Sequence, residues 1–121
     1  MPGTYQELLV WKKAIGLVME VYRATQKFPK EERYGLTSQI RRSAVSIPSN
    51  IAEGQGRLSK GEFKQFLGNA RGSLMELETQ IVISESLGFL DDLGATPLLD
   101  RCSEVGKLLN GLLSSISNPK S

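Results

Sequence analysis

The feature that most restricts the fold is a row of apolar residues near the C-terminus, in which steps of four and three alternate without interruption. The row consists of Leu98, Cys102, Val105, Leu109, Leu112 and Ile116. This spacing places all six side chains on one face of an α-helix, as in the seam of a coiled coil. A helix with such a face must bury it against other helices. The segment therefore requires helical partners elsewhere in the chain.

Three earlier segments show the same helical periodicity, and the chain is predicted to form helices over about residues 6–25, 34–54, 60–88 and 97–117. The second helix carries Leu36, Ile40, Ala44, Ile47 and Ile51. The third carries Phe63, Phe66, Leu67, Ala70, Leu74, Leu77 and Ile81. No segment shows sustained alternation of period two, which argues against strands. A chain of 121 residues is then expected to form a single domain, residues 1–121, of the all-α class: an antiparallel up-and-down four-helix bundle.

Several residues mark the expected helix ends. Ser59 and Glu62 have the spacing of a capping box, Gly88 is expected to stop the third helix, and Thr96 with Pro97 predicts the start of the fourth. Pro48 lies within the second helix, so a kink is expected there, or a break at which Ser46 caps a new start.

The first helix has two apolar rows, which is more than one core requires. The row expected to face the core contains Leu8, Trp11, Ile15, Val18 and Tyr22. The extra apolar residues of the first and fourth helices are Val10, Ala14, Leu17, Val21, Leu99, Leu108 and Leu113. Soluble monomers seldom expose apolar patches of this size. These seven residues are therefore predicted to form the interface of a homo-oligomer.

The composition excludes several kinds of chemistry. The chain has no histidine, which removes the commonest general base, the commonest metal ligand and every imidazole-dependent triad. Its single cysteine, Cys102, cannot form an internal disulfide, which fits a cytoplasmic protein. The apolar stretch AIGLVMEV is too short to cross a membrane. No metal, cofactor or membrane association is predicted.

The stretch SIPSNIAEGQGR, residues 46–57, raises two possibilities of chemistry. Its GQG resembles a phosphate loop only weakly, because no strand precedes it and no Gly-Lys-Ser/Thr follows. Glu53 could pair with Glu76 or Glu78 as catalytic carboxylates. The favoured alternative is a polar seam that fixes the register of the second and third helices. The seam is predicted to contain Ser46, Asn50, Glu53, Ser73 and Gln80. No catalytic residue is predicted, and the protein is not expected to be an enzyme.

Basic residues offer a third possibility. The candidates for contacts with nucleic acid are Arg41, Arg42, Arg57, Lys60, Lys64, Arg71 and Lys12. In a single copy they are expected to be ordinary surface charge, since the net charge is only +2, but repeated around a ring they would form a multivalent phosphate-binding surface. No base-stacking platform is predicted, because Trp11, Tyr22, Phe63 and Phe66 are expected to face inward.

Two long motifs resemble a known family. QIRRSAVSIPSNIAEGQGR, followed by FKQFLGNARGSLMELETQI and LGFL, closely resembles the four-helix-bundle proteins encoded in intervening sequences of bacterial 23S ribosomal RNA genes, the S23-type ribosomal proteins. The same bundle is similar to the accessory protein of diversity-generating retroelements. The resemblance extends from about Trp11 to Leu109, and Arg41, Arg42 and Arg57 match motif positions.

The resemblance implies a bundle that assembles as a ring, commonly a homopentamer. In the retroelement relatives a positively charged ring binds nucleic acid and a reverse transcriptase, and many of those proteins are more basic than this chain. The expected function is therefore that of a non-enzymatic, oligomeric accessory protein associated with nucleic acid or a ribonucleoprotein. The alternative is a structural scaffold for a protein partner that binds no nucleic acid. In either case SIPSNIAEGQGR is expected to be a structural joint.

Overall fold

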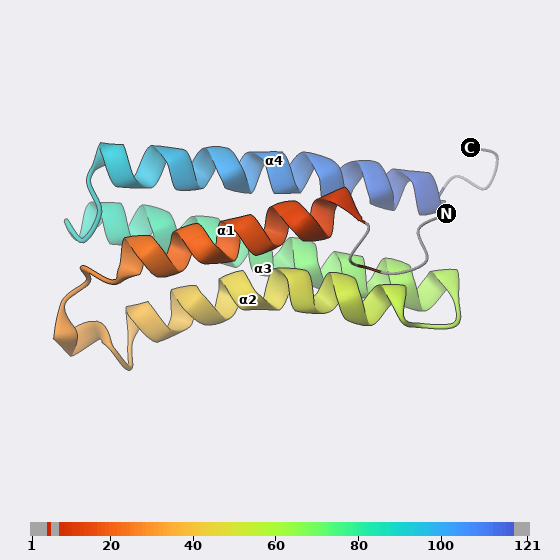
Figure 1. The fold of residues 1–121 in the computed structure, drawn as a ribbon, viewed down its shortest axis with the longest axis horizontal. Coiled ribbons are helices and arrows are strands. Elements are labelled where there is room, and N and C mark those ends of the chain that lie inside the picture. The colour runs from red at the N-terminus through yellow and green to blue at the C-terminus, as the bar shows by residue number, and fades with distance from the viewer. Residues whose placement is uncertain (1–4, 6–7, 118–121) are drawn as a thin grey trace.

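The computed structural model describes residue 5 and residues 8–117, which form four long helices and one short 3₁₀ helix. The helices are α1 (Leu9–Thr25), η2 (Lys30–Glu32), α2 (Leu36–Gln55), α3 (Lys60–Ser86) and α4 (Asp92–Ser117). Successive long helices run in opposite directions (Figure 1), and no strand occurs among the described residues. Both α1 and α3 pack against α2 and α4. The predicted all-α, antiparallel four-helix bundle is confirmed.

The core consists of one apolar stripe from each helix, and three of these stripes are the predicted ones. In α2, Ile40, Ala44, Ile47 and Ile51 are fully buried. The buried residues of α3 include Leu67, Ala70, Leu74, Leu77 and Ile81, and those of α4 include Leu98, Cys102, Val105 and Leu109. Leu112 and Ile116 complete the α4 seam as partly buried residues that pack on the core.

The prediction for α1 was wrong, because the two apolar rows have exchanged roles. The row predicted to form an oligomer interface is buried in the core of the single bundle: Val10, Ala14, Leu17 and Val21. The row predicted to face the core lies at the surface or is half-buried instead, and Ile15 and Tyr22 are 36% and 39% exposed. Buried side chains cannot contact a neighbouring subunit, so these four residues are not an interface.

The two rows have the same spacing, so spacing alone does not show which one is buried. The row of Val10, Ala14, Leu17 and Val21 is the one that continues into the core beyond the end of the helix. The buried row is followed by Thr25 and Phe28, which are also buried. Thr25 Oγ1 donates to the carbonyl of Val21 at 2.8 Å and accepts from Arg41 Nε at 2.8 Å. The bond from Arg41 on α2, together with the burial of Thr25 and Phe28, fixes the rotation of α1 about its axis. The remaining predicted interface residues, Leu99, Leu108 and Leu113, are half-buried and pack against the core of their own bundle.

The second helix continues through Pro48 without a break, and Pro48 itself is buried. Ser46 does not cap a new helix, since its hydroxyl contacts α3 and Asn50 instead. Gly54 lies where α2 closely approaches α3: a Cβ atom there would be 2.8 Å from Phe66 Cβ and 3.0 Å from Phe63 Cδ1. The first glycine of GQG therefore permits helix packing.

The helix ends follow the predictions in two of three places. Ser59 Oγ accepts from the Glu62 amide at 3.1 Å, and the Ser59 hydroxyl lies 3.2 Å from Glu62 Oε1. Gly88 adopts a positive φ of 81° directly after α3. The start of α4 was predicted too late: Asp91 Oδ1 accepts from the Gly94 amide at 2.9 Å, so the helix begins at Asp92 and contains Pro97. The predicted start of the first helix near residue 6 lies outside the described residues.

The exchange of rows on α1 makes a prediction about stability. Leu17→Ala should lower the free energy of unfolding by about 2–5 kcal/mol, because it leaves a cavity in a packed core. Leu9→Ala, at a position that is 55% exposed and lies on neither the buried row nor the row of Ile15 and Met19, should cost about 0.5 kcal/mol or less. Urea denaturation followed by circular dichroism measures both. An equal loss in the two variants would contradict the assigned rotation of α1.

Candidate nucleic-acid interface

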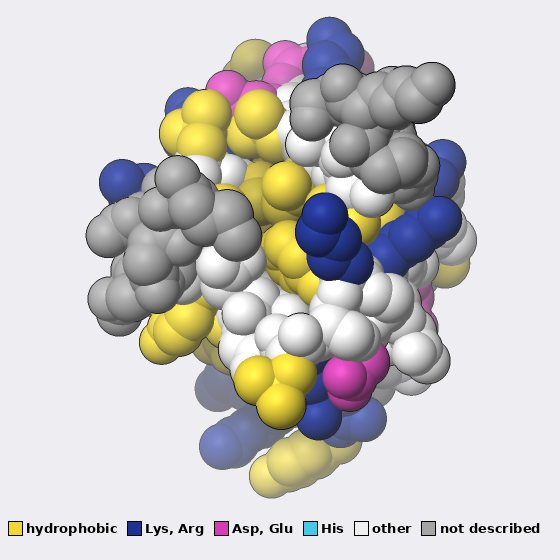
Figure 2. All heavy atoms as spheres, turned by 90° about the vertical axis from the view of Figure 1, so that its right-hand side faces the viewer, with side chains coloured by type: hydrophobic (Ala, Val, Ile, Leu, Met, Phe, Trp, Pro, Cys, Tyr) yellow, Lys and Arg dark blue, Asp and Glu magenta, His cyan; other side chains and the backbone are white. Residues whose placement is uncertain are grey.

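The predicted basic residues do not form one patch. Arg57, Lys60 and Lys64 lie at the turn between α2 and α3, which is the end of the bundle shown in Figure 2, and Lys12 lies in the first turns of α1. At this end Lys and Arg side chains are interspersed with apolar and neutral groups. Arg42 precedes Arg57 by 15 residues, or about 22 Å along a helix. The positions thus fall into separate groups.

Three of the predicted residues lie along the first half of α3. Lys60, Lys64 and Arg71 are exposed, and none forms an ion pair within the part of the chain that the structure describes. Arg57 differs from them: its guanidinium lies 3.8 Å from Glu53 Oε2 and 4.7 Å from the centre of the Phe66 ring. Arg57 therefore covers an aromatic ring at the end of the bundle and is partly neutralised.

Arg41 connects α1 to α2. Its Nε donates to Thr25 Oγ1 at 2.8 Å, its Nη2 lies 3.5 Å from the carbonyl oxygen of Tyr22, and its guanidinium stands 4.6 Å from the centre of the Tyr22 ring. These contacts hold Arg41 in place between the two helices. Its positive charge lines a groove between the end of α1 and the first half of α2.

A groove of about 590 Å³ opens between the end of α1 and the first half of α2. We call it the tyrosine–arginine groove, and it is lined by Tyr22, Arg33, Tyr34, Thr37, Ser38, Arg41, Arg42, Val45 and Ser46. Its lining contains three arginines and no acidic residue. Of the three arginines, only Arg41 and Arg42 were sequence candidates. Arg33 and Tyr34 were missed because they precede the apolar row of the second helix, which begins at Leu36, and no spacing rule singles them out.

The groove also corrects the prediction that Tyr22 faces inward. Tyr22 was expected to face inward, but the rotation of α1 leaves it 39% exposed, and Tyr34 is 87% exposed. The guanidinium of Arg33 lies 5.5 Å from the centre of the Tyr34 ring. Exposed aromatic rings beside arginines are the usual components of a surface that binds unpaired bases.

The polar residues predicted as a seam divide into a connected set and two separate residues. Ser46 Oγ lies 2.8 Å from Ser73 Oγ, and Asn50 Nδ2 donates to the Ser46 carbonyl and hydroxyl at 2.8 and 2.9 Å. Gln80 is buried, and its Oε1 has no hydrogen-bond partner among the described residues. Glu53 is exposed and faces Arg57. The recess lined by Glu76 and Gln80 does not include Glu53, so the geometry forms no carboxylate pair there.

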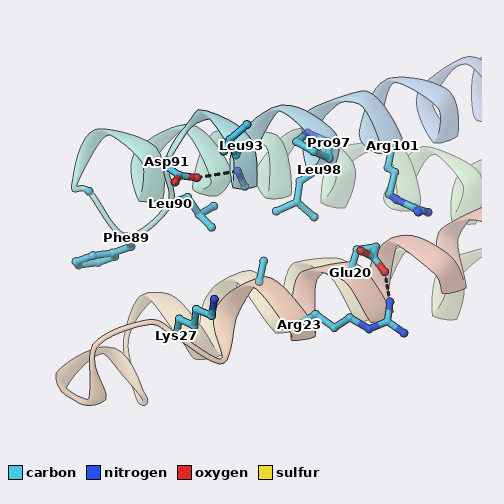
Figure 3. A pocket seen from close by; sticks show the side chains of 13 residues that line it. Glu20, Arg23, Lys27, Phe89, Leu90, Asp91, Leu93, Pro97, Leu98 and Arg101 are labelled. Carbon is cyan, nitrogen blue, oxygen red and sulfur yellow. Dashed lines mark hydrogen bonds and ion pairs between the residues drawn. The ribbon is translucent and has the colours of Figure 1, made fainter.

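A second groove of about 530 Å³ lies between α1 and the α3–α4 turn (Figure 3). Its apolar side chains include Phe89, Leu90 and Leu98. Glu20 and Arg23 form an ion pair across one edge, and Asp91 is held by the Gly94 amide. The lining of this groove holds three basic residues, Arg23, Lys27 and Arg101, against the two acidic residues Glu20 and Asp91, so it offers a ligand less uncompensated charge than the tyrosine–arginine groove.

Reactive groups are scarce in the described part of the molecule. Burial raises the pKa of the Cys102 thiol to about 12, and the Glu78 carboxylate adds to the shift. The thiol is therefore protonated and a poor nucleophile near neutral pH. Among residue 5 and residues 8–117, no three His, Cys, Asp or Glu side chains gather as metal ligands. Within the same residues, none of the helices has the length and apolar character needed to cross a membrane.

The fold and this surface define a class of protein: an all-α bundle with basic side chains and an arginine-lined groove. Comparison with known families is more specific. The chain belongs to the 23S rRNA-intervening sequence protein family, whose model matches residues 6–111.

One solved structure has the same fold. It is the crystal structure of a protein of unknown function from the S23 ribosomal protein family of Bacteroides thetaiotaomicron VPI-5482. The match has a TM-score of 0.81 at 20% sequence identity, and covers 88% of this chain and 96% of that one. No curated protein matches the chain. The family match points to no enzymatic family.

The contact between Ser46 and Ser73 makes a prediction about stability. Each of Ser46→Ala and Ser73→Ala should cost about 1 kcal/mol, because each leaves a partly buried polar group with one partner fewer. The double variant should cost less than the sum of the two, since both remove the same contact. Urea denaturation measures the cycle, and Ser86→Ala is the control, because the Ser86 hydroxyl is exposed and bonds only to its own helix. Strict additivity would contradict the contact.

Proposed function

We propose that this protein is a non-enzymatic accessory factor that associates with nucleic acid or a ribonucleoprotein through a basic surface on α2 and α3. The observation that carries the proposal is a segregation of charge. Residues 33–71 contain seven Lys and Arg against two Glu, although the whole chain has a net charge of only +2. Groups of basic side chains on these two helices attract the phosphate backbone even when the net charge is small.

The two acidic residues of this segment offset only part of its positive charge. Glu53 pairs with Arg57, and Glu62 is engaged at the start of α3 by Ser59. Lys60 and Arg71 are eleven residues apart, which is about 16 Å along the helix and about five steps of a duplex strand. Lys60, Lys64 and Arg71 together could therefore contact three phosphates within that length of one strand.

The proposal includes self-assembly through the exposed apolar row of α1. With Val10, Ala14, Leu17 and Val21 in the core, the outward apolar side chains of α1 include Ile15, Met19 and Tyr22. Burying them between subunits would remove apolar surface from water. The resemblance to S23-type proteins suggests a pentameric ring, in which the basic face would be repeated five times and weak phosphate contacts would gain avidity.

A scaffold that binds a protein partner is the second candidate. It is favoured by a set of apolar side chains at the surface of α3 and its C-terminal end, where Met75, Val82, Ile83 and Leu87 are each at least 42% exposed. A partner helix could cover this surface without touching nucleic acid.

Salt dependence tests the association with nucleic acid. For duplex DNA, Lys60→Glu with Lys64→Glu should reduce the slope of log affinity against log salt by about 2, because each lost phosphate contact removes about 0.9. The control variant, Lys27→Glu with Lys107→Glu, changes the net charge by the same amount. Because both residues lie outside the proposed surface, its salt slope should stay close to that of the parent. Fluorescence anisotropy from about 50 to 200 mM salt measures both. If the parent binds neither RNA nor DNA at the lowest salt, the scaffold is the better function.

Light scattering tests the assembly. The parent should scatter as a multiple of 13.3 kDa at micromolar concentration. Ile15→Glu with Met19→Glu should yield a smaller species that keeps its helical circular dichroism, because both side chains lie outside the core. A parent that is monomeric throughout this range would disprove the assembly.

A further inference from the structure

We propose that the tyrosine–arginine groove binds an unpaired nucleotide of a single-stranded nucleic acid, with the base against Tyr34 and the phosphate between Arg33 and Arg42. This inference rests on the proposed association with nucleic acid and specifies where and in what form the strand binds. The groove is distinct from the exposed lysines of α3, which can contact any phosphate backbone.

The charges in the groove point to an anionic ligand. Arg33, Arg41 and Arg42 line it together, and no carboxylate does. Neither Arg33 nor Arg42 forms an ion pair with any described residue. The nearby Glu32 is occupied elsewhere, since its Oε1 accepts from the Leu36 amide at 3.0 Å at the start of α2. Three like charges around one recess repel one another, and a bound phosphate would relieve that repulsion.

The tyrosines point to a base as the second part of the ligand. Tyr34 is 87% exposed. This is unusual for a large aromatic ring, which would normally pack against apolar side chains of the bundle. Tyr22 has Arg41 over its ring, and Arg41 is held in turn by Thr25. Arg41 is therefore a positioning residue that fixes the wall of the groove. A stacked base would cover aromatic surface, and every base has a face that can stack.

Thr37 supplies an independent sign that the groove is incomplete without a ligand. It lines the groove and is 8% exposed, and its Oγ1 has no hydrogen-bond partner among the described residues. Buried hydroxyl groups are nearly always paired in native proteins. The Oγ1 atom itself is shielded from solvent, so a ligand oxygen or a water in the groove would accept from this hydroxyl after a small shift of the groove wall.

The shape of the site favours an unpaired strand over a duplex. The groove is a recess with side chains from α1, the segment before α2, and α2 itself. In a duplex both faces of each base are covered by neighbours, so only a splayed base can enter a recess and lie against a tyrosine. A phosphorylated peptide could use the arginines, but it would leave the exposed tyrosine without a role.

The test measures binding of single-stranded RNA and DNA of about ten nucleotides, and of a duplex of matched charge, by fluorescence anisotropy. Tyr34→Ala should weaken single-strand binding about tenfold, the lower range for loss of one stacked base, and leave duplex binding and the salt slope unchanged. Tyr34→Phe keeps the ring and should bind like the parent. Arg42→Ala should instead lower the single-strand salt slope by about 0.7. The exposed position of Tyr34 means that its variants should fold normally, which circular dichroism checks.

The outcomes separate this inference from the function on which it rests. If Tyr34→Ala and Arg42→Ala bind single strands like the parent while Lys60→Glu with Lys64→Glu does not, the groove is not the site, but the protein still binds nucleic acid. If a phosphotyrosine peptide binds the groove and single strands do not, the ligand is a phosphopeptide and the inference is wrong. If the parent binds no nucleic acid at low salt, both proposals fail.

Discussion

The close approach of α2 to α3 is the contact on which the rest of the structure depends. At one end it requires Gly54, because any side chain there would collide with Phe63 and Phe66. Midway, the Ser46 and Ser73 hydroxyl oxygens lie 2.8 Å apart, and side chains this short touch only where two helices pack closely. This pairing fixes the rotation of α2, so that Arg41 reaches Thr25 on α1 while Arg42 and Thr37 line the tyrosine–arginine groove.

The sequence predicts the parts of the fold for which its pattern has one solution. In α3, the row through Leu67 and Leu74 is the only continuous apolar face, and it is buried as expected. In α1, two rows with the same spacing compete, and the larger side chains of Trp11 and Ile15 favoured the wrong one. The deciding signal was the continuation of the other row through Thr25 to Phe28. At the start of α4, Thr96 before Pro97 suggested the helix cap, but the side chain that caps the helix is that of Asp91, five residues before Thr96.

The candidate site was harder to predict because it is a consequence of that rotation. Neighbouring residues on a helix differ by about 100° in direction, so choosing the wrong row of α1 turned Tyr22 from the surface into the core. Arg33 and Tyr34 precede the apolar row that begins at Leu36, and their proximity to Arg42 follows from how the chain turns between η2 and α2. By contrast, the seam residues Ser46 and Ser73 could be paired in advance, because both border the apolar stripes of helices that had to pack together.

Tyr22 links the two proposed properties of the molecule. It is the last residue of the exposed apolar row on α1, and it also lines the tyrosine–arginine groove. If a neighbouring subunit covered Ile15 and Met19, the edge of that interface would therefore lie within about one helical turn of the groove. In such a ring the grooves would lie beside the subunit boundaries and repeat at regular intervals. A single strand could then occupy several grooves in succession, and affinity that is modest at one groove would increase through avidity. The small net charge of the chain would not limit binding, because the strand would meet only its basic face.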